Sequence, residues 1–210
     1  MKNEILKRLI TAILISLISF FFIVLGNYFL ILFLLITFSI SIFEWKSLAS
    51  NIYILIIGFF YLIFSFSTFY LLRDINLSFL IFTLLISIFS DIGGYIIGKL
   101  FKGPKLTKIS PNKTYSGMIG SYFFSFLIGF IYIKFSDIYN FQLHVVFIVF
   151  YIFLIASINQ LGDLLISYFK RLKKANDTGN LLPGHGGLLD RIDGMIFSIP
   201  SSYLFYMISI

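Results

Sequence analysis

Acidic and basic side chains in the second half of this 210-residue chain are spaced so that they could act on phosphate groups. Asp163 follows a long apolar run. The polar residues four, seven and eight positions after it, on one helical face, are Ser167, Lys170 and Arg171. Asp190 and Asp193, three positions apart, would also share a face. The chain has no cysteine, so these converging carboxylates predict an oxygen-ligated Mg²⁺ site formed by Asp163, Asp190 and Asp193.

A glycine-rich segment lies between these carboxylates and adds a second phosphate-binding feature. Its sequence is Pro183-Gly184-His185-Gly186-Gly187. Glycine permits positive φ and lets backbone N–H groups approach an anion closely. Together with Lys170 and Arg171, the segment predicts a site for a polyphosphate and its metal.

An upstream polar loop, residues 98–120, is expected to complete that site. Its candidate phosphate-binding residues form one turn and are Ser110, Asn112, Lys113 and Thr114. A small-residue run from Gly117 to Gly120 then opens the next helix, whose N-terminal amides favour anions. The preceding helix contributes Asp91, and its Gly94 and Gly98 form a small-residue face suited to close helix packing.

The elements that position these residues are membrane helices. The chain is 59% hydrophobic and 12% charged, about half the charge of a typical soluble domain. Seven apolar stretches are long enough to be spans or nearly so. They are 9–25, 27–43, 47–72, 75–98, 117–133, 138–161 and 194–210. We expect an all-α, polytopic membrane bundle that forms one domain, 1–210, with N-terminal helices in 1–75 and catalytic helices and loops in 76–210. The two functional loops are 98–120 and 162–193.

The distribution of basic residues predicts the orientation of the bundle. A cytoplasmic N-terminus would put 14 of the 16 Lys and Arg residues on the cytoplasmic side, with only Arg73 and Lys134 outside. We therefore expect an integral protein of the cytoplasmic membrane whose site faces the cytoplasm. The basic, apolar N-terminus has no small-residue cleavage site, so we interpret it as a retained anchor. Glu44 and Trp45 are expected to anchor a helix end at the membrane interface.

The two loops resemble the phosphatidate cytidylyltransferase (CDP-diacylglycerol synthase) family. The matching pattern runs from Gly162-Asp163 through Ser167-x-Phe169-Lys170-Arg171, Asp177-x-Gly179 and Pro183-Gly184-His185-Gly186-Gly187-x-Leu189-Asp190-Arg191-x-Asp193. Upstream, Asp91-x-x-Gly94-Tyr95 and Ser110 to Thr114 with Gly117 look like that family's other conserved region. The resemblance covers about residues 88–197. Asn176, Ser116 and Gly194 depart from the usual pattern, and the chain is short at its N-terminal end.

This resemblance implies transfer of CMP from CTP to phosphatidate, with Mg²⁺ and room for a second cation. The catalytic residues it implies are Asp163, Asp190, Lys170 and Arg171. The substrate-binding residues it implies are Ser110, Asn112, Lys113, Thr114, Asp91, Asp177, Gly184, His185, Gly186, Gly187 and Arg191. The expected partners are CTP, phosphatidate and membrane lipids, and the Gly94/Gly98 face leaves a homodimer open.

The same residues are compatible with other functions. A related enzyme, including a lipid kinase, could act on a polyprenol or an ether lipid through similar loops. A transporter of a phosphorylated solute would place its binding residues near the bilayer midplane, whereas these cluster at one face. An inactive homologue is favoured only by Asn176. Nucleic-acid binding is excluded because the basic loops lack interleaved aromatic residues for base stacking.

Overall fold

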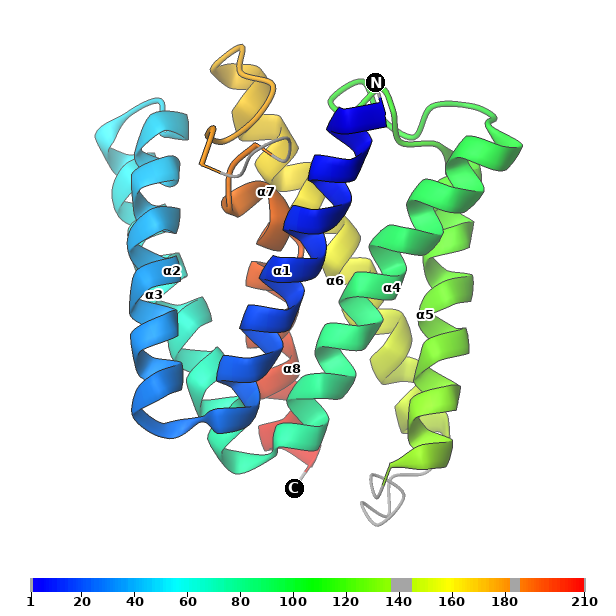
Figure 1. The fold of residues 1–210 in the computed structure, drawn as a ribbon. Helices are drawn as coiled ribbons and strands as arrows, with labels where there is room; N and C mark the ends of the chain where they lie inside the picture. Colours follow the sequence, from blue (N-terminus) through cyan, green and yellow to red (C-terminus); the bar gives the residue numbers. More distant parts are fainter. Residues whose placement is uncertain (1, 137–144, 182–185, 210) are drawn as a thin grey trace.

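The computed structural model describes residues 2–136, 145–181 and 186–209, and within these the chain is helical apart from turns and loops (Figure 1). The helices are α1 (Lys2–Leu25), α2 (Asn27–Leu48), α3 (Ile52–Ile75), α4 (Leu77–Phe101), α5 (Tyr115–Phe135), α6 (Val145–Leu172), α7 (Leu189–Ile192) and α8 (Met195–Ser209). In the described ranges, β pairing is limited to one isolated bridge between Lys105 and Thr114. The predicted all-α class is confirmed.

Successive long helices run in opposite directions and form an upright bundle. The start of α1, the α4–α5 connection and the segment between α6 and α7 lie at one end, and the C-terminus lies at the other (Figure 1). Among the described residues, α2, α3, α4, α5 and α6 are long and apolar enough to span a membrane. Leu14–Leu25 and Met195–Ser209 are shorter apolar helices. The chain is therefore an integral membrane protein, with helices in all seven predicted apolar stretches.

The first two helices are separated at the boundary between the predicted stretches 9–25 and 27–43. Gly26 has a φ of +68° and Asn27 a φ of +48°, values that end α1 and start α2. Arg73 at the end of α3 donates to the carbonyls of Ile23 at 3.0 Å and Val24 at 2.9 Å. These carbonyls lack partners within α1 because they lie in its last turn. A side chain at Gly26 would overlap the Arg73 guanidinium, so glycine is needed here for two reasons.

The Gly94/Gly98 face is used inside the chain, against α5. A Cβ on Gly120 would lie 2.6 Å from the carbonyl oxygen of Gly93, and one on Gly117 would lie 2.8 Å from that of Gly94. Close packing of small residues on both helices brings the two backbones together. This face therefore packs within the chain, and the expected homodimer stays a prediction.

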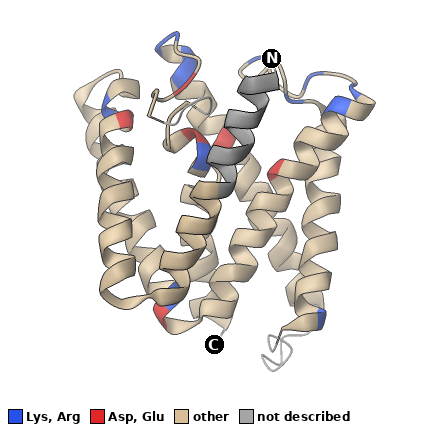
Figure 2. Cartoon of the chain, in the orientation of Figure 1, with Lys and Arg blue, Asp and Glu red and all other residues tan. Residues whose placement is uncertain are grey.

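The charged residues follow the predicted asymmetry (Figure 2). Basic side chains of the described loops gather at the end that carries the α4–α5 connection, whereas Arg73 and Lys134 lie at the opposite end. One boundary differs from the prediction: α6 continues to Leu172, past the expected end at Leu161. These extra turns carry Asp163 and Lys170. Their spacing of seven positions places both on one face of the helix.

Candidate functional site

The first half of the site is an ion pair between the upstream loop and α6. Lys113 Nζ lies 2.6 Å from Asp163 Oδ2, and both side chains are about a quarter exposed. The loop is held by its own backbone, since Lys113 N donates to Ser110 O at 3.0 Å. Thr114 then caps α5 by accepting a hydrogen bond from Gly117 N at 3.1 Å. Thus the first loop and the end of the sixth helix meet, as predicted.

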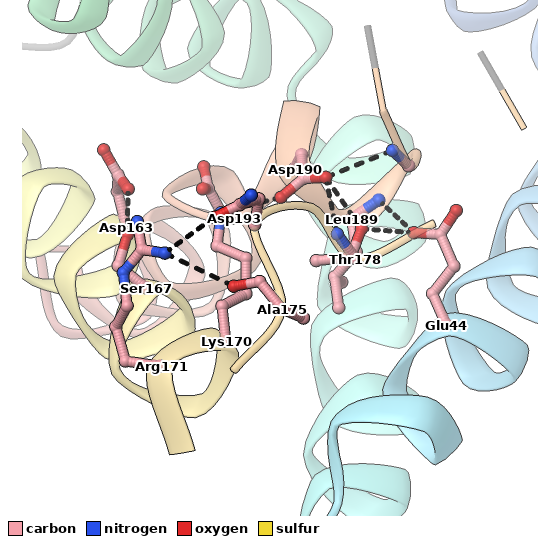
Figure 3. A network of polar contacts seen from close by, with 12 residues as sticks. Glu44, Asp163, Ser167, Lys170, Arg171, Ala175, Thr178, Leu189, Asp190 and Asp193 are labelled. Atoms are coloured by element: carbon pink, nitrogen blue, oxygen red, sulfur yellow. Dashed lines mark hydrogen bonds and ion pairs between the residues drawn. The ribbon is translucent and has the colours of Figure 1, made fainter. Parts of the chain in front are cut away.

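Asp190, in the first turn of α7, is the centre of the second half of the site (Figure 3). Its Oδ1 accepts from Lys170 Nζ at 2.7 Å, and only 5% of its side chain is exposed. Its Oδ2 accepts from Thr178 N at 2.8 Å, Thr178 Oγ1 at 3.0 Å and Gly187 N at 3.1 Å. Burial alone would raise the pKa of Asp190, but these hydrogen bonds and the charge of Lys170 hold it below its usual value.

Glu44 of α2 extends this network across the bundle (Figure 3). The residue is 3% exposed. Its Oε1 accepts from Leu188 N at 2.8 Å, and its Oε2 accepts from Leu189 N at 2.7 Å. Thr178 Oγ1 also lies 2.9 Å from Oε2, so Thr178 contacts Glu44 and Asp190 together. Glu44 and Trp45 are both buried, so their side chains contact other parts of the protein. Their expected place at the membrane interface stays a prediction.

Asp193 lies just beyond α7 and is 8% exposed. Its Oδ1 accepts from Gly194 N at 2.9 Å. Burial raises the pKa of Asp193, and the negative charges of Asp163 and Asp91 raise it further. Asp91 itself accepts from Asn159 Nδ2 at 2.8 Å. Three carboxylates from α4, α6 and the α7–α8 junction are therefore close enough to repel one another.

The network in Figure 3 lies within a region that matches a known protein family. The model of the cytidylyltransferase family matches residues 44–209, more than three quarters of the chain. This chain belongs to the cytidylyltransferase family. The matched region starts at Glu44 and contains both loops, α6 and α7. The family assignment thus agrees with the resemblance noted in the sequence.

Individual members of the cytidylyltransferase family show the same likeness. The protein named phosphatidate cytidylyltransferase from Staphylococcus haemolyticus (strain JCSC1435) is 38% identical over 136 residues, which cover 64% of this chain and 51% of the relative. The one from Staphylococcus aureus (strain COL) has the same identity and coverage. The one from Staphylococcus saprophyticus is 38% identical over 145 residues, 69% of this chain and 52% of the relative. The chain spans about half the length of these relatives.

Some of the predicted site residues make contacts that hold the two loops in place. Arg171 is exposed and donates to Ile109 O at 3.4 Å and to Asn176 Oδ1 at 3.2 Å. It therefore bridges the two loops. Gly186 has a φ of +79°, where glycine is favoured. The N–H of Gly187 donates to Asp190 Oδ2 at 3.1 Å, and its use as a phosphate donor stays a prediction.

The remaining predicted substrate residues divide by exposure. Asn112, Asp177 and Arg191 are exposed at the loop end of the bundle, and Ser110 and Thr114 are partly buried. Gly184 and His185 lie outside the described residues. Exposure of Asn112 and Asp177 leaves their side chains accessible to a ligand.

The predicted three-carboxylate metal site is not assembled in the described part of the chain. No group of three or more Asp, Glu or His side chains there is close enough to hold a metal ion. The reason lies in Asp190, whose oxygens are directed at Lys170, Thr178 and Gly187. Asp163 and Asp193 repel each other, and a cation that replaced Lys113 beside Asp163 would relieve this repulsion.

Glu44 and Thr178 are the side chains of the network that sequence reasoning did not assign to the site. Glu44 lies 119 positions before Asp163, outside the two motifs quoted above. One signal in the sequence was available, because a carboxylate at the end of an apolar helix needs hydrogen-bond donors. Nothing in the sequence indicated that these donors are the backbone N–H groups of residues 188 and 189.

Proposed function

We propose that the protein transfers CMP from CTP to phosphatidate, forming CDP-diacylglycerol and pyrophosphate for phospholipid synthesis. The observation that carries this proposal is the convergence of two carboxylate–lysine pairs, Asp163 with Lys113 and Asp190 with Lys170, at the basic end of a membrane bundle. Membership of the cytidylyltransferase family and relatives named phosphatidate cytidylyltransferase support the same reaction.

The chemistry requires charge neutralisation more than acid–base catalysis. A phosphatidate oxygen attacks the α-phosphorus of CTP, a new P–O bond forms, and the bond to the bridging oxygen of the β-phosphate breaks. Phosphatidate is already anionic, so no strong general base is needed. Lys113, Lys170 and Arg171 would neutralise the acceptor phosphate and the leaving pyrophosphate. Their positions at the ends of the two loops bring them to one end of the bundle.

Mg²⁺ is part of the proposal, and Asp163 and Asp193 would hold it. Both supply the oxygen ligands that Mg²⁺ prefers, and burial together with neighbouring negative charge makes an unneutralised Asp193 unfavourable. When bound, the ion would offset the negative charge of the triphosphate. Asp190 would keep Lys170 in place, and Lys113 would be free to contact phosphate once Asp163 has another partner.

The site is proposed to face the cytoplasm, where CTP is available. Basic residues concentrated at the site end of the bundle support this orientation. A lipid substrate would bring its headgroup to this end while its tails lie between or beside the helices. Anionic membrane lipids would be attracted by the same basic loops.

An acceptor panel tests the substrate assignment. Purified protein in detergent receives CTP, Mg²⁺ and, separately, phosphatidate, a polyprenyl phosphate or an ether-linked phosphatidate analogue. We expect phosphatidate to give CDP-diacylglycerol and pyrophosphate in equal amounts. A product with the polyprenyl phosphate alone would replace the proposed acceptor, and CTP binding with no product from any acceptor would refute the transferase.

A further inference from the structure

Glu44 is a buried carboxylate on the N-terminal side of the chain that the proposed chemistry does not use. At 3% exposure, it accepts from the backbone N–H groups of Leu188 and Leu189 at 2.8 and 2.7 Å, and it shares the Thr178 hydroxyl proton, 2.9 Å away, with Asp190. A buried carboxylate is costly unless it is fully hydrogen-bonded, and losing the acceptor would leave these donors unsatisfied. Glu44 therefore fixes the positions of residues 178, 188 and 189 relative to α2.

The loop backbone packs closely against Glu44. A Cβ on Gly187 would overlap Thr178 Oγ1 and would lie 2.6 Å from Glu44 Oε2. A Cβ on Gly179 would lie 3.0 Å from Glu44 Oε1. Two glycines thus let the loop backbone close around the carboxylate from both sides. The small size of these two glycines lets the loop backbone approach Glu44.

The helix that carries Glu44 is itself held in place. The ring of Trp45 meets that of Phe169 on α6 edge to face, with centroids 5.0 Å apart. Its Nε1 donates to Ile54 O at 3.2 Å. Ser47 Oγ donates to Glu44 O within α2 at 2.7 Å and lies 3.4 Å from Thr178 O, which is a second approach between α2 and the loop. The backbone that carries Glu44 is therefore fixed by packing, which is required of a residue that orients others.

We propose that Glu44 is a positioning residue that, through Thr178 and the N-terminus of α7, keeps Asp190 directed at Lys170. This inference rests on the proposed function for its catalytic consequence. Thr178 connects the two carboxylates. Its Oγ1 shares one proton between Glu44 Oε2 at 2.9 Å and Asp190 Oδ2 at 3.0 Å, and its backbone N–H donates to Asp190 Oδ2 at 2.8 Å. Asp190 Oδ1 in turn accepts from Lys170 Nζ at 2.7 Å. The N-terminal helices thereby become part of the catalytic unit.

The main test is Glu44→Gln, which keeps the size but replaces one acceptor oxygen with an NH₂ donor. That NH₂ would face one of the N–H groups that Glu44 now accepts from. Displacing catalytic groups by about 1 Å can cost about 100-fold in rate, and we expect a kcat loss of that order with little change in KM for CTP. Asp74→Asn is the matched control, because Asp74 is an exposed carboxylate at the end of α3 and should keep wild-type kcat.

Coupling to Thr178 separates positioning from general stability. If Glu44 acts through Thr178, the kcat losses of Glu44→Gln and Thr178→Val will be less than multiplicative in the double variant. Glu44→Asp, which keeps the charge, should recover part of the activity. A kcat for Glu44→Gln equal to that of wild type, or multiplicative losses in the double variant, would overturn the proposal.

Hydrogen exchange distinguishes failure of this inference from failure of the proposed function. In Glu44→Gln, the amides of Leu188 and Leu189 should exchange faster than in wild type, whichever reaction the protein catalyses. Unchanged exchange would overturn the structural role of Glu44. If Glu44→Gln exchanges faster but the wild type has no cytidylyltransferase activity, the proposed function is refuted while the structural role of Glu44 stands.

Discussion

Asp190→Asn perturbs the second carboxylate–lysine pair with the smallest change in shape. Asp190 now serves Lys170 with one oxygen and three loop donors with the other. An asparagine has a single acceptor oxygen, so its NH₂ must face either the Lys170 ammonium or the N–H groups of Thr178 and Gly187. The variant therefore leaves donors opposed to donors inside the loop. We expect losses of both stability and activity.

The size of the stability loss follows from burial. Side chains in this pair are 5% exposed for Asp190 and 12% for Lys170. Removing one partner of a buried ion pair costs about 3–5 kcal/mol, and partial solvation of Lys170 favours the lower end, about 3 kcal/mol. In a chain of this length, that corresponds to a drop of about 6–12 °C in the midpoint of thermal unfolding.

The assay is thermal unfolding in detergent, followed by tryptophan fluorescence, on three variants. Asp190→Asn should unfold below the wild type by the stated interval. The Asp190→Asn, Lys170→Met double variant should regain part of that loss, because no ammonium remains without its partner. Asp177→Asn, at an exposed position of the same loop, should shift the midpoint by about 1 °C or less. Unfolding of Asp190→Asn at the wild-type temperature would refute this reasoning, as would a double variant less stable than the single one.

Further predictions concern four other positions. Lys113→Gln should lower kcat/KM by about 10- to 100-fold, the range expected for a lost hydrogen bond to a charged group, and steady-state kinetics with varied CTP measures it. Asp193→Asn should abolish activity yet raise the unfolding midpoint of EDTA-treated protein at neutral pH. The folded-state pKa of Asp193 is raised, so its charge costs stability above the usual aspartate pKa, and the gain should vanish below that pH in a pH series of melts. Gly187→Ala should lower both activity and midpoint, because its Cβ would overlap Thr178. Arg73→Gln removes two hydrogen bonds to the last turn of α1. The midpoint should fall by about 2–4 °C for each kcal/mol of unfolding free energy lost, while kcat stays at the wild-type value.

Much of the fold was predictable because lipid allows few structures. Backbone groups in the bilayer must be satisfied within a helix, so apolar stretches and their breaks locate the helices. The break at Gly26 and the gathering of basic residues at one end are both found. The end of α6 was predicted eleven residues early, because apolarity marks the edge of the membrane and says nothing of where a helix continues into water.

The sequence predicted which residues belong to the site better than it predicted which of them contact each other. Spacing placed Asp163 and Lys170 on one face of a helix, and the structure confirms it. Which lysine meets which carboxylate depends on how α4–α5 and α6–α8 pack, and that is a property of distant parts of the chain. Glu44 illustrates the same limit, since its partners lie 134 to 145 residues away in sequence.

The most direct test of the account follows the phosphorus atoms of CTP. Purified protein is given phosphatidate, Mg²⁺ and CTP labelled with ³²P at either the α or the γ position, and the lipid is extracted. Cytidylyl transfer should carry the α-label into the lipid as CDP-diacylglycerol while the γ-label leaves as pyrophosphate. Entry of γ-label into the lipid would identify a kinase, and absence of both labels from the lipid would contradict cytidylyl transfer.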